Sequence, residues 1–429
     1  MKKLNDYKEE IHKCSKCGLC QSVCPVYEQT GNDCSVSRGK FIMLNGIIKG
    51  DLTLNKNVNK YLNMCLKCNA CKNFCPSGIN ARQIFIAAKS EYFQKSPERK
   101  FISHFQSKFV FTTVLKLVKI ASELYRFFKL DKMVPNFYPI FQKMEWLGKK
   151  MILANEFVSV HGKKAKVQAF QSPNAPKIVY FKGCVNEFIN PKVKNATENV
   201  LLSLGVEVLP SAFECCGVPF LSCGNIEQFK KQAEFNLSQI PDEFDYFLTD
   251  CASCQNAFEE YKNYIEDENL LQKLDKISAK SLNVTEFLMQ NIKSVEFSEK
   301  TSFTFHKPCH MENTEFIKEF LVKSKNVEYI EMKEFDKCCG FSGEFAIKNP
   351  ELSQQISAKK AQNAVDTNAD YILTSCPACI LGLTQGLIEN KSNKQPLNFI
   401  EFLSMADKIT IKDITKATPS EQVIQTPVC

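Results

Sequence analysis

The 429-residue chain lacks several features that mark common protein classes. Its first ten residues contain no apolar core, so we expect neither a signal peptide nor a membrane anchor there. No run of about 18 uncharged apolar residues occurs, which argues against a membrane-spanning helix. There is no G-x-G-x-x-G motif after a strand pattern and no Walker motif, so we expect no flavin or nucleotide site. These absences predict a cytoplasmic chain, with peripheral contact to the cytoplasmic membrane left open.

Cysteine is the residue in clear excess, with 21 copies. A cytosolic chain is kept reduced, so clustered cysteines there usually bind metal and do not pair as disulfides. The formal charge of +8 counts every cysteine as neutral, and thiolate ligands around metal clusters would offset part of it. Because no RNA- or DNA-binding motif accompanies the basic balance, we expect no nucleic-acid partner.

Two internal repeats organise the cysteines. The shorter one follows the pattern C-x2-C-x2-C-x3-C-P twice, at an offset of 51 residues, with the second copy beginning at Cys65. This run is typical of two-cluster bacterial ferredoxins, in which the fourth cysteine ligates the other cluster. A tight loop delivers three thiolates to a cubane cluster, and the fourth must come from a distant segment.

We therefore expect two cubane [4Fe-4S] clusters with interleaved ligands. Cubane set 1 is Cys14, Cys17, Cys20 and Cys75, and cubane set 2 is Cys65, Cys68, Cys71 and Cys24. The alternative is a pair of zinc sites, but these usually take two C-x2-C pairs and need no third cysteine or C-P. Residues 38–48 and 57–64, between the two halves, have helical periodicity.

The longer repeat has five cysteines in each copy, at offsets of 123 to 125 residues. Its copies are Cys184, Cys215, Cys216, Cys251 and Cys254, then Cys309, Cys338, Cys339, Cys376 and Cys379. Short apolar strands are predicted at 177–181, 206–209 and 246–249, and again at 302–305, 327–332 and 371–374. Helical patterns at 191–204 and 226–237 alternate with the first three.

This alternation predicts parallel α/β sheets. Every cysteine element follows a strand, so each five-cysteine set should converge at one edge of its sheet, where open α/β folds bind ligands. Gly217 and Gly340, after the paired cysteines, are expected to let the backbone pass close to a bulky cofactor. The fold class is thus α+β and α/β, with an N-terminal helical ferredoxin-like module and two repeated α/β domains.

The spacing C-x(~30)-C-C-G-x(~35)-C-x2-C resembles the cysteine-rich CCG domain. That domain occurs in heterodisulfide reductase B and D subunits and in iron–sulfur subunits of glycolate oxidase, lactate utilisation and anaerobic glycerol-3-phosphate dehydrogenase. The layout of the whole chain is similar to that of the glycolate oxidase iron–sulfur subunit. Local matches are Cys-Pro-Ser-Gly at 75–78, Ser-Pro-Glu-Arg at 96–99, Cys-Cys-Gly-Phe-Ser-Gly-Glu-Phe at 338–345 and Asn-Pro-Glu-Leu at 349–352.

The resemblance implies a noncubane [4Fe-4S] cluster on each five-cysteine set. CCG set 1 is then Cys184, Cys215, Cys216, Cys251 and Cys254, and CCG set 2 is Cys309, Cys338, Cys339, Cys376 and Cys379. Zinc in one CCG domain, a simpler cluster or a redox dithiol remains an alternative. Residues 36–39 lack the proline that the family often has there. Because both sets are complete, the chain leans toward the heterodisulfide-reductase-like or lactate-utilisation type.

The expected domains follow from the repeats. They are 1–100 (two-cluster ferredoxin-like), 101–172 (helical linker), 173–295 and 296–408 (first and second CCG domains) and 409–429 (flexible tail). Residues 101–160 are basic and carry aromatic residues at helical spacing. This segment is expected to pack in the core, or alternatively to dock a partner or the membrane surface.

Three cysteines and two histidines lie outside these sets. Cys34 is interpreted as a free thiol, Cys223 as a buried structural cysteine and Cys429 as incidental. His306 and His310 flank Cys309, whereas the first copy has Phe181 and Val185 at the matching positions. We expect hydrogen-bonding roles near the cluster for both histidines, with proton handling as the alternative.

The resemblance implies an iron–sulfur electron-transfer subunit of a respiratory oxidoreductase. Hydride chemistry on a 2-hydroxy acid needs a flavin or a nicotinamide. The implied partners are an FAD-containing dehydrogenase of glycolate, lactate or glycerol 3-phosphate, and a quinone or another redox carrier. Two alternatives stay open: a heterodisulfide-reductase-like catalytic subunit that reduces a disulfide or a quinone, and a zinc-stabilised interaction protein.

Overall fold

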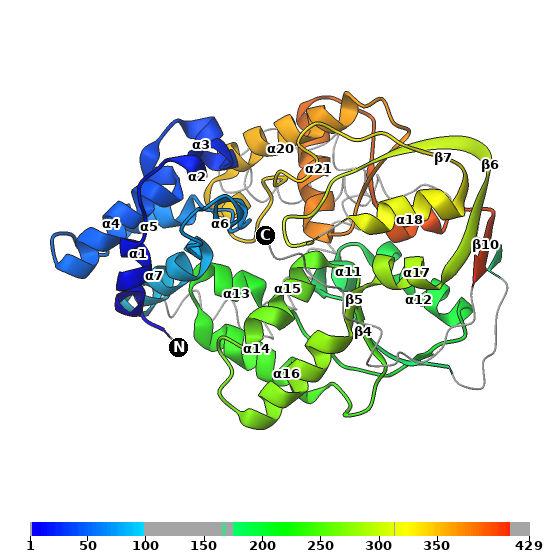
Figure 1. Cartoon of the computed structure of the whole chain (residues 1–429), viewed down its shortest axis with the longest axis horizontal. Helices are drawn as coiled ribbons and strands as arrows, with labels where there is room; N and C mark the ends of the chain where they lie inside the picture. Colours follow the sequence, from blue (N-terminus) through cyan, green and yellow to red (C-terminus); the bar gives the residue numbers. More distant parts are fainter. Residues whose placement is uncertain (1, 98–165, 168–174, 313, 412–429) are drawn as a thin grey trace, which may run out of the picture.

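The computed structural model describes residues 2–97, 166–167, 175–312 and 314–411. In Figure 1 the N-terminal module, in blue and cyan, lies at one end of the molecule, beside the two repeated domains, in green and in yellow to orange. The predicted linker at 101–172 lies outside the described residues, apart from strand β1 (Lys166–Val167). Cys429 and the tail from residue 412 onward also lie outside them.

The N-terminal module is helical, as predicted. Its helices are η1 (Leu4–Tyr7), α1 (Lys8–His12), α2 (Leu19–Ser22), α3 (Pro25–Thr30), η2 (Asp33–Ser35), α4 (Ser37–Lys49), α5 (Lys56–Asn63), α6 (Ala70–Asn73) and α7 (Ala81–Lys95). The helices predicted at 38–48 and 57–64 are confirmed as α4 and α5. The short helices α2 and α6 carry cysteines of the two ferredoxin runs and pack against each other.

The first CCG domain is a four-stranded sheet with helices between its strands. Its elements are β2 (Lys177–Phe181), α11 (Cys184–Phe188), α12 (Pro191–Ser203), β3 (Glu207–Val208), α13 (Val218–Cys223), α14 (Ile226–Ser238), β4 (Tyr246–Thr249), α15 (Ala252–Tyr261), α16 (Glu268–Lys280), β5 (Ser281–Asn283) and α17 (Val284–Asn291). The strand order is β3-β2-β4-β5, and every pair is parallel. β2 and β4 match the predicted strands residue for residue.

The second CCG domain repeats this topology. Its elements are β6 (Ile292–Phe305), α18 (Glu315–Lys323), β7 (Ser324–Tyr329), α19 (Phe345–Lys348), α20 (Pro350–Val365), β8 (Tyr371–Thr374), α21 (Pro377–Glu389), β9 (Pro396–Asn398), α22 (Phe399–Leu403) and β10 (Lys408–Ile411). The parallel order β7-β6-β8-β9 matches β3-β2-β4-β5 strand for strand. The two repeats in the sequence therefore fold as two copies of one unit.

The second sheet departs from the prediction at its edge. β10 pairs antiparallel with the first half of β6, and β1 adds in parallel to β10. The prediction of a flexible tail from residue 409 is therefore wrong for residues 409–411, which lie in β10. β7 begins three residues before the predicted strand at 327–332, because the pairing with β6 and not the local apolar run sets its start.

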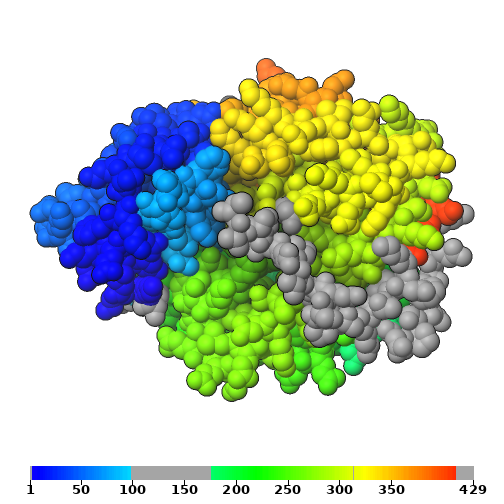
Figure 2. All heavy atoms as spheres, in the orientation of Figure 1, coloured from blue at the N-terminus to red at the C-terminus, as the bar shows by residue number. Residues whose placement is uncertain are grey.

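A shared hydrophobic core joins the two CCG domains, with buried side chains from β2 through β10 in one cluster. The N-terminal module docks on both: α7 packs against α13, and α3 packs against α20. Figure 2 shows the module in contact with both domains on the face in view. Across the described ranges, no helix has both the length and the apolar character to span a bilayer.

Candidate metal centres

CCG set 1 lies at the carboxyl ends of two neighbouring parallel strands. Cys184 begins α11 after β2, and Cys251 follows β4 with Asp250 between them. The Cys184 and Cys215 sulfurs are 3.5 Å apart. Side-chain hydrogen bonds then link the other thiols in the order Cys215, Cys216, Cys254 and Cys251. The predicted convergence of the five cysteines at one sheet edge is thus what the fold produces.

CCG set 2 is arranged in the same way around β6 and β8. Cys376 follows β8 at the start of α21, and Cys309 follows β6. Thiol-to-thiol hydrogen bonds connect the five residues in the order Cys309, Cys338, Cys339, Cys379 and Cys376. All except the half-buried Cys309 are buried.

The two CCG sets meet each other. The Cys251 thiol of the first set hydrogen-bonds with the Cys376 thiol of the second. The Ser253 hydroxyl lies 3.6 Å from the Cys376 sulfur, and the backbone N–H of Ala252 donates to the carbonyl of Ser375 at 3.3 Å. The carboxyl edges of the two sheets therefore face one another, and their cysteine sets are adjacent.

Cubane set 2 in turn lies against CCG set 2. After burial, the charges of Cys65 and Cys68 help to raise the pKa of Cys24. The charges of Cys65, Cys68 and Cys24 likewise help to raise the pKa of Cys71, so the four thiols lie close together. The hydrogen bond with Cys338 is the largest cause of the raised pKa of the Cys68 thiol. Cys24, Cys68, Cys338 and Cys309 also pack against one small hydrophobic cluster. Cys24 thus joins the second cysteine run, as the interleaved pattern predicts.

Cubane set 1 lies at the outer side of the module. Burial raises the pKa of the Cys20 thiol, and the charges of the nearby Cys14 and Cys17 add to the rise. Cys75 packs, like Cys14, against the hydrophobic core of the module. Cys17 is exposed, and hydrogen bonds from the Leu19 backbone N–H and the Ser15 hydroxyl lower its pKa. Cubane set 1 therefore has one ligand at the protein surface.

The donor chemistry of these sets fits iron–sulfur clusters. Burial raises the pKa of Cys24 to about 11 and that of Cys71 to about 12, so these thiols stay protonated unless a positive centre binds them. In CCG set 1, hydrogen bonds from Cys215 and Cys254 lower the pKa of Cys216 to about 5. The cysteines of the described residues are all free thiols, which leaves the sulfurs available as ligands.

Two residues beside the ferredoxin sets were not predicted. Lys40 is 1% exposed, and its charge interacts with the thiols of Cys65, Cys24 and Cys71, although burial lowers its pKa. The Ser37 hydroxyl donates to the Cys71 sulfur at 3.2 Å. Buried ammonium groups need a counter-charge, and an anionic thiolate-ligated cluster supplies one. Lys40 and Ser37 both lie on the buried side of α4. The helical periodicity of this segment could therefore have indicated that both side chains are buried.

The glycines after the paired cysteines are required by backbone conformation and by helix packing. Gly217 and Gly340 have φ of +82° and +83°, a conformation that L side chains rarely adopt. A Cβ at Gly217 would also lie 2.7 Å from a ring carbon of Phe229 on α14, and one at Gly340 2.9 Å from Ile356 on α20. These glycines turn the chain and let α14 and α20 pack close to it.

A buried carboxylate positions the first CCG set. Asp250 precedes Cys251 and accepts hydrogen bonds from the Tyr180 hydroxyl at 2.6 Å, the Asn186 amide at 2.6 Å and the Thr197 hydroxyl at 2.9 Å. Burial raises the pKa of Asp250 to about 6, while the three donors oppose that rise. The carboxylate thereby ties β2, α11 and α12 to the end of β4.

Replacing Asp250 with alanine should destabilise the chain and loosen the first CCG set selectively. Three buried donors would lose their acceptor, and an unsatisfied buried group costs about 1–3 kcal/mol. We expect denaturant unfolding to show a loss of at least about 2 kcal/mol. Iron bound at CCG set 1 should fall while the ferredoxin signals stay. The exposed Asp242→Ala variant is the matched control, and an equal loss there would contradict the assignment.

The two histidines beside Cys309 differ in their surroundings. His310 makes the expected hydrogen bonds: Nδ1 lies 3.3 Å from the Ser253 hydroxyl and Nε2 3.4 Å from the Lys67 carbonyl. It therefore joins the N-terminal module to both CCG domains, and burial lowers its pKa to about 4. His306 is fully buried, and neither ring nitrogen has a hydrogen-bond partner among the described residues. The Phe335 carbonyl is nevertheless near enough to act on the ring as a backbone acceptor, so the hydrogen-bonding role predicted for His306 stays a prediction.

Cys34 and Cys223 are the two described cysteines that belong to none of the four sets. Cys34 is half-buried in η2, with its backbone N–H bound to the Asn32 side chain at 2.9 Å. Cys223 ends α13 and lies beside Glu344 and Lys89, and burial together with the Glu344 charge raises its pKa to about 12. The interpretation of both as non-ligands stays a prediction.

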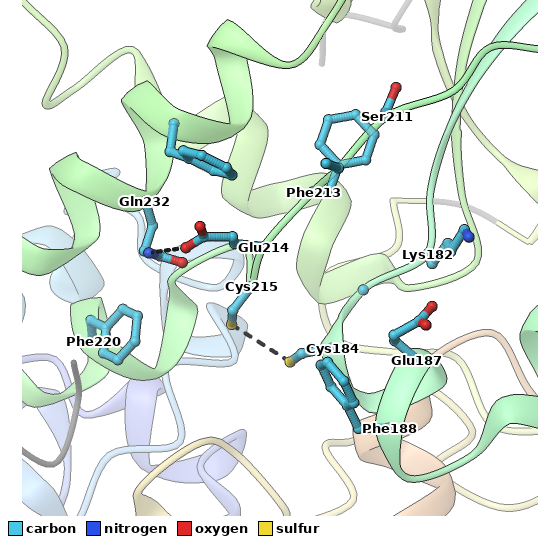
Figure 3. A pocket seen from close by; sticks show the side chains of 13 residues that line it. Lys182, Cys184, Glu187, Phe188, Ser211, Phe213, Glu214, Cys215, Phe220 and Gln232 are labelled. Atoms are coloured by element: carbon cyan, nitrogen blue, oxygen red, sulfur yellow. Dashed lines mark hydrogen bonds between the residues drawn. The ribbon is translucent and has the colours of Figure 1, made fainter. Parts of the chain in front are cut away.

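A cavity of about 440 Å³ opens beside CCG set 1. Its wall includes the thiols of Cys184 and Cys215, which face each other in Figure 3. Phe188 and Phe213 supply apolar surface, and Lys182 and Glu187 supply charge. The sequence patterns did not predict this cavity, because its lining comes from α11, the loop before Cys215 and α14.

Comparisons with known proteins agree with this geometry. A 4Fe-4S dicluster domain model matches residues 10–79, and a cysteine-rich domain model matches residues 178–259 and 303–384. Lactate utilization protein A of Bacillus cytotoxicus is 30% identical over 226 residues, which cover 51% of this chain and 94% of that protein. The probable glycolate oxidase iron-sulfur subunit of Bacillus subtilis is 24% identical over 412 residues, 89% of this chain and 91% of that protein.

Two cysteine-rich domains behind a dicluster module define an iron–sulfur protein. The chain belongs to the family of CCG-domain iron–sulfur proteins that includes lactate utilization protein A. A crystal structure of a hypothetical protein from Helicobacter pylori aligns with 86% of this chain and 76% of that one. Its TM-score of 0.42 and identity of 10% make that likeness too distant to bear on function.

Proposed function

We propose that the chain is the electron-transfer subunit of a respiratory oxidoreductase that oxidises a small 2-hydroxy acid such as glycolate or lactate, or glycerol 3-phosphate. In this proposal the cubane sets hold two [4Fe-4S] clusters and the CCG sets hold two noncubane [4Fe-4S] clusters. The ligands are the eighteen cysteines predicted from the two repeats. The family's iron–sulfur domains and the names of its relatives support this assignment.

The observation that carries the proposal is the unbroken line of cysteine sets. Cys68 contacts Cys338 between cubane set 2 and CCG set 2, and Cys251 contacts Cys376 between the two CCG sets. Cubane set 1 adjoins cubane set 2 through the packing of α2 on α6. A storage or purely structural role needs no such adjacency, whereas electron transfer does.

The exposed end of this line suits a flavoprotein partner. Cys17 of cubane set 1 is exposed, and Leu19 and Phe74, next to two ligands of that set, are 47% and 58% exposed. Exposed apolar side chains beside a redox centre are typical of a docking surface. We infer that an FAD-containing dehydrogenase delivers electrons here.

The cavity at the opposite end suits a small electron acceptor. Cys184 and Cys215 form part of its wall, so a molecule bound there would contact CCG set 1 directly. The aromatic side chains of Phe188 and Phe213 fit the planar ring of a quinone. Electrons would then travel from cubane set 1 through cubane set 2 and CCG set 2 to CCG set 1.

Anaerobic reconstitution with the partner flavoprotein tests this function. With substrate present, all four centres should become reduced, as followed by absorbance near 400 nm and electron paramagnetic resonance, and quinone should be reduced in turn. Omission of the flavoprotein should abolish the substrate-dependent reduction. Full reduction by substrate without it would contradict the proposal, as would a colourless preparation with stoichiometric zinc.

The cavity also favours a second candidate function. A disulfide bound between Lys182 and the Cys184–Cys215 pair would lie against CCG set 1, as a heterodisulfide-reductase-like reaction requires. Reduction of one disulfide consumes two electrons and two protons and yields two thiols. Disulfide-dependent turnover by the isolated chain, with a chemical reductant and no flavoprotein, would favour this function over the relay.

A further inference from the structure

His306 is the buried polar side chain that the proposed relay leaves unexplained. It follows β6 directly, three residues before Cys309, and is 0% exposed. Among the described residues neither buried ring nitrogen has a partner in good hydrogen-bond geometry, although the Phe335 carbonyl acts on the ring as a backbone acceptor. Leaving a buried polar group unpaired costs about 1–3 kcal/mol, so such groups nearly always have a partner.

The ring lies among atoms of the kinds that bind metals. One ring nitrogen of His306 and the sulfurs of Cys339 and Cys379 all lie within 4.8 Å of one another, and all three residues are buried. Neutral imidazole and thiolate are both ligands of zinc and of iron–sulfur clusters. Metal-bound histidines usually donate their other N–H to a backbone carbonyl, and the Phe335 carbonyl offers such an acceptor.

The fold itself does not require a histidine at this position. In the first CCG domain the matching residue is Phe181, which is fully buried and packs its ring against Phe213 and Phe258 at centroid distances of 5.0 Å. An aromatic hydrocarbon therefore fills this position in the same topology. The imidazole of the second domain adds ligand atoms where the first domain has none.

We propose that His306 ligates the metal centre of CCG set 2 together with Cys339 and Cys379. The inference rests on the proposed function in that it takes this centre to be an iron–sulfur cluster. CCG set 2 is then a mixed cysteine–histidine site, whereas CCG set 1 is an all-cysteine site. The imidazole adds a neutral nitrogen donor that the first centre lacks, and the identity of the ligands is one of the factors that tune reduction potential.

Pulsed electron paramagnetic resonance on the full chain, grown with ¹⁵N-histidine, tests this ligation. The four sets otherwise contain cysteine alone, so a directly bound histidine nitrogen should appear as one strong ¹⁵N coupling. His306→Phe, which installs the first domain's residue, should abolish the coupling and shift the midpoint potential of one centre only. His310→Val, which installs the other first-domain residue, should keep the coupling.

Iron and zinc analysis separates failure of this inference from failure of the relay. Iron for four clusters without any strong histidine coupling in the wild-type chain would overturn the ligation and leave the relay intact. Zinc in CCG set 2 would overturn the relay, and zinc X-ray absorption would then test the ligation through a nitrogen at about 2.0–2.1 Å. If His306→Phe fails to fold, the wild-type spectrum and His306→Asn still decide the question.

Discussion

Replacing Cys339 with alanine should remove the centre of CCG set 2 and stop electrons from reaching CCG set 1. Cys339 hydrogen-bonds with Cys338 and Cys379 in the middle of the set, and it is 2% exposed. Alanine has no ligand atom, and the loss of an outer-shell partner alone costs about 10- to 100-fold in such sites. We therefore expect substrate-dependent quinone reduction to fall by more than about 100-fold.

The position of CCG set 2 makes this prediction specific. Rapid-freeze electron paramagnetic resonance should show both cubane centres reduced by the flavoprotein at the wild-type rate, because they precede the break. Iron content should fall by one cluster. Cys34→Ala is the matched control, since Cys34 lies in η2 outside all four sets and should leave iron and activity unchanged. Normal reduction of CCG set 1 in Cys339→Ala would contradict the proposed order of centres.

The strands that precede the cysteines were predictable because each is a short, continuous apolar run. β2, β4 and β8 are buried along almost their whole length, so hydrophobicity alone marks them. β5 (Ser281–Asn283) and β9 (Pro396–Asn398) were missed, since each has three residues with no such run. Their pairing with β4 and β8 comes from the tertiary fold.

The composition of the cysteine sets was predictable, but their order in space was not. Equal spacing in two copies identifies which cysteines belong together. The contacts of Cys68 with Cys338 and of Cys251 with Cys376 arise from the packing of the N-terminal module and the two CCG domains against one another. Nothing in the spacing of one repeat specifies which face of it meets the next, so the linear arrangement could not be read from the sequence.

His306 illustrates the opposite limit. The sequence placed it near Cys309 and showed that its counterpart is Phe181, which are the two facts that make it unusual. The groups around its ring, which are the sulfurs of Cys339 and Cys379 and the Phe335 carbonyl, come from segments distant in the sequence. A default hydrogen-bonding role was therefore the reasonable expectation, and the two sulfurs close to the ring could not be foreseen from the sequence.

The largest effect on stability is expected at the ion pair that fixes the N-terminal module to the second CCG domain. Lys89 of α7 is 1% exposed and pairs with Glu344, whose side chain is 8% exposed. Replacing Lys89 with methionine should cost about 3 kcal/mol, at the low end for a broken buried pair, because Lys348 still contacts Glu344 at 3.1 Å. Anaerobic denaturant unfolding measures this loss.

A double-mutant cycle separates the interaction energy of Lys89 with Glu344 from the cost of burying each charge. Glu344→Gln should lower the free energy of unfolding less than Lys89→Met does. Burial already lowers the pKa of Lys89 to about 8, so the lysine left without its partner can lose its proton and become neutral. The combination Lys89→Met with Glu344→Gln should be more stable than Lys89→Met alone, since no unpaired charge remains. Strict additivity of the two changes would show that the charges do not interact.

The same pair predicts how stability depends on pH. Although burial opposes it, the charges of Lys89, Lys67 and Lys348 lower the pKa of Glu344 from 4.5 to about 2. A depressed carboxyl pKa contributes stability that is full above the unfolded value near 4.5 and is lost as pH falls toward 2. The loss is on the order of 3 kcal/mol, at about 1.4 kcal/mol per pH unit. Glu344→Gln should lack this acid-dependent part of the wild-type unfolding curve, and an identical acid dependence in both proteins would contradict the assignment.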